Sequence, residues 1–163
     1  MNIIINKGFL KYKGHKFRCS IGKLGSSSTK KEGDLTTPKG FFKLGPIYFR
    51  KDRIKSIKSK LKKIIIRKNM GWCDDPHSKK YNKEINFPFR YSAEKLFKKG
   101  KSYDIFINIK YNQKPTRKNK GSAIFLHLTN QQYKPTKGCI AILKKDFIKI
   151  LPLINNNTKI LIK

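Results

Sequence analysis

The chain has 163 residues, 37% of them hydrophobic, a size and composition that suit one globular domain with a buried core. No apolar run approaches the roughly 18 residues of a membrane span, and the first residues lack the pattern of a secretory signal peptide. The three cysteines are an odd number, which excludes a complete disulfide framework.

In chain order, short apolar or alternating runs predict strands at residues 2–6, 9–13, 15–21 and 41–44, with the second and third forming a hairpin around Gly14. Residues 22–33 are a polar loop. The loop at 34–40 is held in shape by Pro38, and Asp34 is expected to form a turn there. The lysine-rich residues 51–63 fit either a loop or a short irregular helix.

The second half continues with a strand at residues 64–66 and a compact polar loop at 70–82 that holds the only tryptophan, Trp72. Residues 91–97 predict a short helix capped by Ser92, and residues 146–154 predict another that Pro152 limits. Strands are expected at 103–109 and 158–162. The sum is one domain over residues 1–163, mainly β (α+β), a barrel or sandwich with two or three short helices.

The most informative stretch is residues 122–142, where an apolar strand carries His127 near its end and a polar loop then leads to Gly138-Cys139 and a second apolar strand. Two adjacent strands would bring His127 and Cys139 together. A thiol beside an imidazole can become a thiolate–imidazolium pair, which makes cysteine nucleophilic near neutral pH. Gly138 would give a substrate room and leave a backbone N–H for an oxyanion.

Structural readings of the same residues stay open. A cysteine in an apolar run often only fills the core, and a histidine at a strand end is often only hydrogen-bonded. Cys19 lies in an alternating stretch and is expected in the core. A Cys19–Cys73 disulfide has no support in the sequence but is not excluded. Cys73 and His77 have the spacing of two zinc ligands, yet no second pair completes a site, so no metal or other cofactor is predicted.

The charge is extreme. Lys and Arg number 40 against 9 Asp and Glu, for a formal net charge of +31. A field this positive attracts nucleic acid, anionic membrane or an acidic polymer, with a steep dependence on salt. Alternatively, a coding bias toward Lys, Ile and Asn leaves the charge as a solvated surface, and we favour this cause. Nucleic acid is not favoured as a partner, because no aromatic-plus-basic RNA motif is present.

An ordered set of short motifs resembles the L,D-transpeptidase catalytic domain, also called the YkuD family, and in particular its short single-domain proteobacterial members. The resemblance covers the chain from about Gly22 to its end. The motifs are Gly33-Asp34, Thr37-Pro38, Gly40, Phe42, Gly71-Trp72-Cys73-Asp74-Asp75-Pro76, Tyr81-Asn82, Tyr103-Asp104, Tyr111-Asn112, Gly121 to His127 and Pro135-Thr136-Lys137-Gly138-Cys139. Gly-Cys alone is a weak signal, whereas the whole ordered set is specific.

The resemblance implies a β-rich domain that carries out cysteine acyl transfer on peptidoglycan stem peptides, forming 3–3 or 1–3 crosslinks. By position, Cys139 would be the nucleophile, His127 the base oriented through the carbonyl of Leu128, and Gly138 part of the oxyanion hole. We expect the substrate to contact residues of the Gly-Cys loop and of the loop at 70–82, namely Thr136, Lys137, Trp72, Asp75 and Tyr81.

Two positions depart from the family pattern. Members commonly carry His just before Gly-Cys and Arg shortly after it, where this chain has Lys137 and Ala141. The first departure leaves His127 as the only imidazole of the motif. The second removes a common partner for a substrate carboxylate, and the sequence does not select a replacement.

The sequence is compatible with three functions. They are a transpeptidase, a hydrolase or carboxypeptidase with the same Cys/His site, and a basic polyanion-binding module without catalysis. The transpeptidase hypothesis implies peptidoglycan stem peptides as partners and an anionic wall polymer as a further partner. It also implies that the protein is a monomer. By resemblance it also implies a periplasmic or wall-associated location, although no export signal is visible in the chain.

Overall fold

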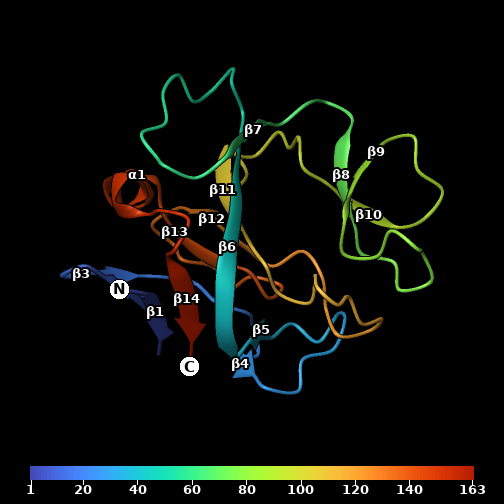
Figure 1. Ribbon diagram of the computed structural model, residues 1–163, viewed down its shortest axis with the longest axis horizontal. Helices are drawn as coiled ribbons and strands as arrows, with labels where there is room; N and C mark the ends of the chain where they lie inside the picture. Colours follow the sequence, from blue (N-terminus) through green and yellow to red (C-terminus); the bar gives the residue numbers. More distant parts are fainter.

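Strands dominate the computed structural model, which describes all residues from 1 to 163 (Figure 1). The main sheet has nine strands in the order β13-β12-β11-β6-β14-β1-β2-β3, with β7 beside β6 off this path. Its strands are β1 (Ile3–Asn6), β2 (Phe9–Tyr12), β3 (His15–Arg18), β6 (Gly40–Phe49), β7 (Lys63–Ile65), β11 (Ile105–Ile109), β12 (Phe125–Thr129), β13 (Ile140–Leu143) and β14 (Lys159–Ile162). The mainly β prediction is confirmed.

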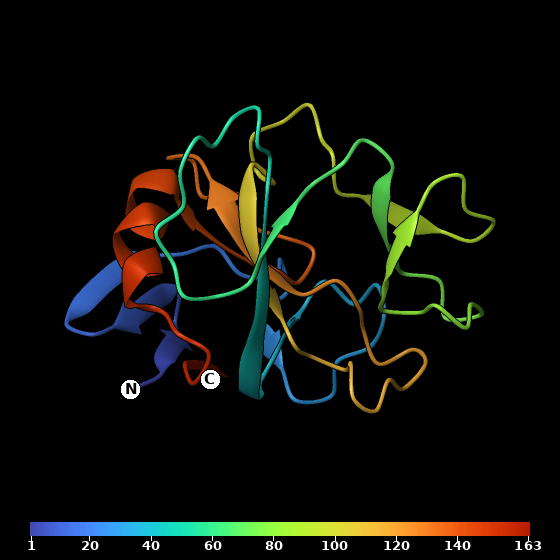
Figure 2. The ribbon, with the colours of Figure 1, turned by 45° about the horizontal axis from the view of Figure 1, so that its top comes forward.

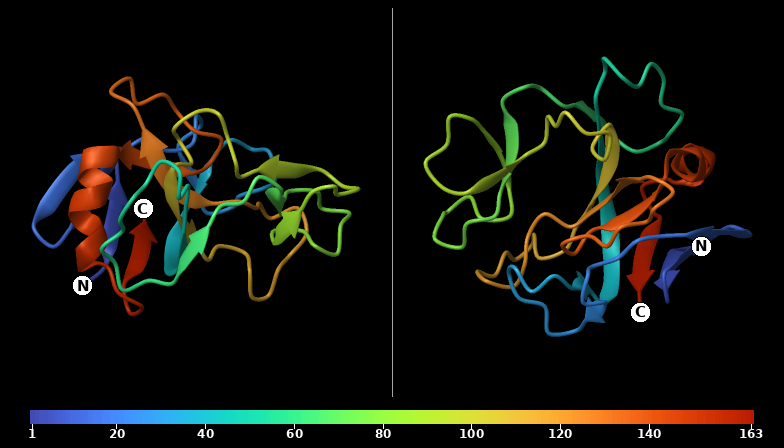
Figure 3. Two further views of the ribbon diagram at one scale, coloured as in Figure 1. Left: turned by 90° about the horizontal axis from the view of Figure 1, so that it is seen from above. Right: turned by 180° about the vertical axis from the view of Figure 1, so that it is seen from behind.

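The remaining elements are small. They are a three-stranded sheet of β8 (Met70–Cys73), β9 (Glu84–Asn86) and β10 (Ala93–Lys95), the pair β4 (Ser26–Ser27) and β5 (Thr37–Pro38), helix α1 (Lys144–Ile150) and the 3-10 turn η1 (Leu151–Leu153). The small sheet and α1 lie on opposite sides of the long strand β6 (Figures 2 and 3). No helical segment has the length and apolar character that crossing a bilayer requires.

The main sheet is closed at its ends by the chain that follows β3. Ser20 and Ala141 exchange two backbone hydrogen bonds of 2.8 and 3.0 Å, so the segment after one outer strand pairs with the other outer strand, β13. A second bridge joins Gly22 to Thr136. Closure satisfies backbone groups that an open sheet would expose. It also fixes both sides of the segment that carries Gly138 and Cys139.

Two hydrophobic clusters fill the interior. The larger lies between the main sheet and α1, and it includes Leu126, Leu128, Ile140, Ile142 and Phe147. The smaller is aromatic and joins the three-stranded sheet to the main one; its members are Tyr48, Ile66, Met70, Trp72, Leu96, Tyr103, Phe106 and Phe125. Because side chains alternate along a strand, β12 supplies Leu126 and Leu128 to the larger cluster and Phe125 to the smaller one.

Several predicted elements differ in the structure. The helix expected at 91–97 is wrong: its centre is β10, whose residues pair with β8 from Ala93↔Cys73 to Lys95↔Gly71. Such a short helix is marginal by itself, so strand pairing prevails. The loop expected at 70–82 begins with the buried strand β8. Residues 51–63 are not helical. The chain therefore has one α-helix, and the helix expected at 146–154 corresponds to α1 and η1, which begin two residues earlier, at Lys144, and end at Leu153.

Strand β6 is longer than the four residues expected, and it continues past Gly45-Pro46 to Phe49. Opposite it, Ile107 pairs with Ile47 and Ile109 with Leu44, so two residues of β6 face the single residue Asn108. This bulge accommodates Pro46, which has no N–H to donate to a regular ladder.

We expect Phe106→Ala to lower the free energy of unfolding by about 3–5 kcal/mol, the usual cost of removing a buried phenyl ring. Phe106 is 0% exposed and stacks on Tyr48 and Phe125, with ring centroids 4.9 and 4.6 Å away. Phe41→Ala, at a ring that is 50% exposed, is the control and should cost well under half as much in the same urea titration. Equal losses would contradict the packing described.

Candidate active site

His127 and Cys139 come together because β12 and β13 are parallel neighbours in a fixed register. Leu126 pairs with Ile140 and His127 with Ala141, which places Cys139 directly opposite Phe125. Side chains alternate along each strand, so Cys139 and His127 extend to the same face, away from the larger cluster. The prediction that His127 and Cys139 lie on adjacent strands is therefore confirmed, and both side chains line one cavity.

The sulfur of Cys139 is held by backbone groups of the segment entering β12. It lies 3.2 Å from the carbonyl oxygen of Ala123, to which the thiol donates, and 3.4 Å from the backbone nitrogen of Phe125. Its side chain packs against the aromatic cluster, and the residue is partly exposed. Cys19 and Cys73 are buried and free, so the chain contains no disulfide.

The ring of His127 is oriented through the backbone. Its Nδ1 lies 2.9 Å from the carbonyl oxygen of Leu128, so Nδ1 carries a hydrogen and donates it. The other ring nitrogen, Nε2, then keeps a lone pair and is able to accept a proton. No hydrogen bond joins the ring to Cys139, whose sulfur contacts Ala123 and Phe125 instead. The Tyr103 ring packs edge-on against the imidazole at 5.3 Å between centroids.

Both members of the pair are neutral at pH 7. Burial raises the pKa of the Cys139 thiol to about 12, and the negative charge of Glu94 adds to the rise. Burial also lowers the pKa of His127 to about 4. These shifts favour a thiol beside a neutral imidazole at rest, and the ion pair that the sequence allows stays a prediction. The imidazole is thereby in the form that can act as a base.

The loop before Cys139 is shaped by Thr136 and Gly138. Thr136 Oγ1 donates to the carbonyl oxygen of Cys139 at 2.6 Å and accepts from the backbone N–H of Gly138 at 3.1 Å. That N–H is therefore not free, contrary to the sequence-based expectation. Gly138 has φ +139°, and a Cβ there would lie 2.8 Å from the carbonyl oxygen of Thr36. The loop needs glycine for its conformation and its close approach to residue 36.

Lys30 is a neighbour of this loop that sequence reasoning missed. It is 5% exposed, and its Nζ donates to Asp34 at 2.7 Å. Asp34 also accepts from the backbone N–H groups of Lys31 and Thr36, as expected for a turn former. Burial alone would raise the pKa of Asp34, but the bond from Lys30 and the two backbone bonds hold it well below its usual range. The Lys30 stem passes beside Gly121, where a Cβ would lie 2.8 Å from its Cε.

A cavity of about 1500 Å³ opens at the pair. Its wall includes Cys139, His127, Thr136 and Lys137, as well as three residues that sequence reasoning did not assign to the site: Glu94, Lys98 and Tyr103. Tyr103 belongs to one of the motifs that resemble the family, but the sequence assigned it no role. Glu94 and Lys98 gave no signal, because their segment resembled a helix and only the pairing of β10 with β8 brings them to the cavity.

Three of the predicted substrate contacts lie outside the cavity wall. The buried Trp72 indole N–H donates to Asn82, and the buried Tyr81 hydroxyl contacts Glu32 and accepts from the Gly121 backbone N–H. Asp75 accepts from the backbone of His77, and its neighbour Asp74 lines the cavity instead. The structure thus gives these residues structural contacts and leaves their substrate role a prediction. No three His, Cys, Asp or Glu side chains gather as a metal site would require.

The neutral pair predicts a pH profile for alkylation of Cys139 by iodoacetamide. Only the thiolate reacts, and with a thiol pKa of about 12 its fraction grows about tenfold for each pH unit. The rate should rise throughout pH 6–9 without a plateau, followed by peptide mass spectrometry that separates Cys139 from Cys19 and Cys73. A plateau reached by pH 7 would instead indicate a preformed ion pair.

Comparison with known proteins places this site in context. No curated protein matches the chain. Among solved structures, the helical cell shape determining protein Pgp2 from Campylobacter jejuni has TM-score 0.54 and 16% identity, covering 99% of this chain and 46% of its own. Bd1075 from Bdellovibrio bacteriovorus has TM-score 0.48 and 15% identity, covering 99% and 47%.

An L,D-transpeptidase from Mycobacterium smegmatis has TM-score 0.40 and 12% identity, covering 95% of this chain and 52% of its own. The chain thus spans about half the length of these proteins. Residues 6–162 match the YkuD family, described as the L,D-transpeptidase catalytic domain. Nearly the whole chain lies within that match, so the protein belongs to the L,D-transpeptidase (YkuD) family of enzymes.

Proposed function

We propose that this chain is a peptidoglycan L,D-transpeptidase with Cys139 as nucleophile and His127 as base. The observation that carries the proposal is the placement of both side chains on one face of the β12–β13 pair, at the mouth of a large cavity. The free Nε2 of a neutral, backbone-oriented imidazole suits proton transfer. Membership of the L,D-transpeptidase family supports the substrate class.

The first half-reaction forms an acyl-enzyme. His127 Nε2 takes the proton of the Cys139 thiol as the sulfur attacks the carbonyl carbon at an L-to-D junction of the donor stem. The backbone N–H of Cys139 stabilises the oxyanion. The carbon–nitrogen bond then breaks, the leaving amine receives the proton from His127, and a thioester remains on the sulfur. Because the thiol is neutral at rest, deprotonation accompanies attack.

The second half-reaction releases the product. An amine of a neighbouring stem attacks the thioester carbon, and His127 takes the proton of that amine. The carbon–sulfur bond then breaks, and His127 passes the proton to the sulfur to restore the thiol. The result is a 3–3 or 1–3 crosslink, depending on the donor. Lys137 and other cations of the cavity wall, among them Lys134 and Lys144, provide charge for the substrate carboxylate that an Arg after Gly-Cys binds in other members.

Water in place of the amine would make the same site a carboxypeptidase or hydrolase. Nothing in the arrangement of Cys139 and His127 selects between the two acceptors, since both steps use the same thioester and the same base. The products do differ, because only transfer to an amine yields a dimer.

We expect Cys139→Ala to abolish dimer formation from a purified disaccharide-tetrapeptide, and His127→Gln to lower it by roughly 100-fold or more, the usual contribution of a general base. Product mass analysis measures both dimer and hydrolysed monomer. Cys19→Ala, at a buried cysteine away from the cavity, is the matched control and should retain activity. Crosslinking by Cys139→Ala would overturn the assignment, whereas monomer alone from the wild type would favour the hydrolase.

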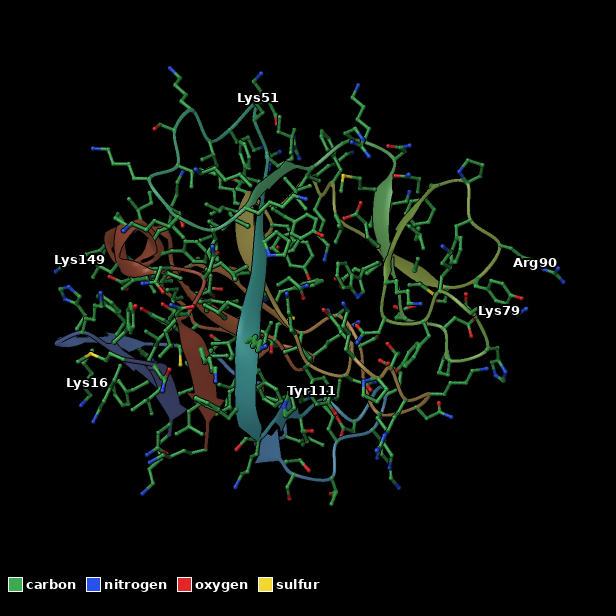
Figure 4. All side chains as sticks on the ribbon, in the orientation of Figure 1. Lys16, Lys51, Lys79, Arg90, Tyr111 and Lys149 are labelled. Atoms are coloured by element: carbon green, nitrogen blue, oxygen red, sulfur yellow. The ribbon has the colours of Figure 1, made fainter.

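The positive surface suggests how the enzyme is held on its substrate. Lys16, Lys51, Lys79, Arg90 and Lys149 are exposed and project from different sides of the molecule (Figure 4). We propose that this diffuse charge attracts an anionic wall polymer, and that the protein acts in the periplasm or at the cell wall, where crosslinking could affect cell shape. Recovery of the native protein wholly in the cytosol would argue against this location.

Pull-down of the protein with purified sacculi should be strong at about 10 mM salt and largely lost near 1 M, because the screening length falls from about 30 to about 3 Å. Cys139→Ala should bind equally well. Binding that ignores salt would contradict an electrostatic attachment. Equal binding with no crosslinking by the wild type would support the polyanion-binding module without catalysis.

A further inference from the structure

A hydrogen-bonded group of three side chains lies in the cavity wall beside the catalytic pair. Glu94 Oε1 accepts from the Nζ of Lys98 at 2.6 Å and from the Tyr103 hydroxyl at 3.0 Å. The Lys98 Nζ also sits 3.8 Å from the centroid of the Tyr103 ring. All three line the same cavity as Cys139 and His127. The reaction proposed above uses none of these contacts between them.

Tyr103 connects this group to the reacting sulfur. Its side chain is buried, its ring packs edge-on against His127, and it belongs to the aromatic cluster against which Cys139 packs, in the wall of the same cavity. A phenol has one hydrogen to donate. In the resting structure that hydrogen goes to Glu94, while the sulfur donates its own to Ala123. The Tyr103 hydroxyl and the Cys139 sulfur therefore share one cavity wall, and at rest each donates its hydrogen to a different acceptor.

The charged and polar groups around the Cys139 sulfur affect how readily it loses its proton. The groups that face it are His127 on β12, Glu94 on β10, and Lys98 and Tyr103 from the segment between β10 and β11. Lys30 approaches Gly138 and is paired with Asp34. The Glu94 carboxylate disfavours a negative sulfur, whereas donation from Tyr103 favours one. The two residues thus act on the thiolate in opposite directions.

We propose that Tyr103 is a catalytic hydrogen-bond donor to the Cys139 thiolate and that Glu94 restrains it at rest by holding its hydroxyl hydrogen. As the thiol proton passes to His127 Nε2, the Tyr103 O–H turns from Glu94 to the sulfur; the phenol keeps its proton throughout. Lys98 stays with the carboxylate and compensates its charge. The inference rests on Cys139 being the nucleophile proposed above.

The test compares Tyr103→Phe and Glu94→Gln by the rate of Cys139 alkylation with iodoacetamide across pH 6–9. The thiolate displaces iodide, so the rate reports the thiolate fraction without any peptidoglycan substrate. Tyr103→Phe should slow the reaction about tenfold, which corresponds to a thiol pKa one unit higher. Glu94→Gln should accelerate it by a similar factor. In the Tyr103→Phe background, Glu94→Gln should accelerate it less, because the two residues share one hydrogen bond.

The chain offers a matched control. The Tyr48 hydroxyl donates to Glu84 at 2.8 Å in the same phenol-to-carboxylate arrangement, and neither residue lines the cavity. Tyr48→Phe and Glu84→Gln should leave the alkylation rate of Cys139 unchanged. If the role of Tyr103 were only to pack the site, both cavity variants would loosen it and accelerate alkylation alike. That result, or an unchanged rate in Tyr103→Phe, would overturn the proposal.

Circular dichroism confirms folding of each variant. Should Tyr103→Phe fail to fold, Glu94→Gln decides alone, since no acceleration there would also overturn the proposal. Failure of the Tyr103 proposal can be distinguished from failure of the proposed transpeptidase function. Opposite shifts in alkylation without any crosslinking by the wild type would leave the Tyr103 role standing and remove the transpeptidase. Crosslinking with no shift in the alkylation rate would support the transpeptidase and remove the role of Tyr103.

Discussion

The parallel register of β12 and β13 is the constraint on which the site depends. It sets Cys139 opposite Phe125 and His127 opposite Ala141, so both functional side chains leave one face while leucines and isoleucines of the same strands enter the main core. A shift of one residue would bury the thiol and expose the core. Closure of the sheet through Ser20 and Ala141 holds the other side of β13 and resists such a shift.

The same packing that fixes the pair also keeps it neutral. The sulfur lies against an aromatic cluster and near the Glu94 carboxylate, an environment that favours thiol over thiolate. A resting thiol is less prone to oxidation than an exposed thiolate, and it leaves activation to the moment of reaction. The imidazole is ready as a base for the same reason, because burial removes its positive charge.

The sequence predicted the pair of strands, the Gly-Cys loop and the turn at Asp34, because each depends on local signals such as apolar runs, glycine and proline. Glu94 and Lys98 were out of reach, because their place at the cavity depends on pairing of β10 with β8, some twenty residues earlier. The raised pKa of Cys139 could not be predicted either, since its main cause is burial that only the fold creates. Likewise, the buried hydrogen bonds of Trp72 and Tyr81 could not be predicted, because their partners Asn82 and Gly121 are placed by the fold.

The central claim is that Cys139 attacks a stem peptide and carries its acyl group. It is tested most directly by mixing the protein with a defined donor muropeptide, quenching in acid within seconds and mapping the modified peptide by mass spectrometry. The account predicts an acyl mass on the peptide that contains Cys139, absent in Cys139→Ala and greatly reduced in His127→Gln. An acyl group on another residue, or turnover with no adduct at Cys139 at any time, would contradict it.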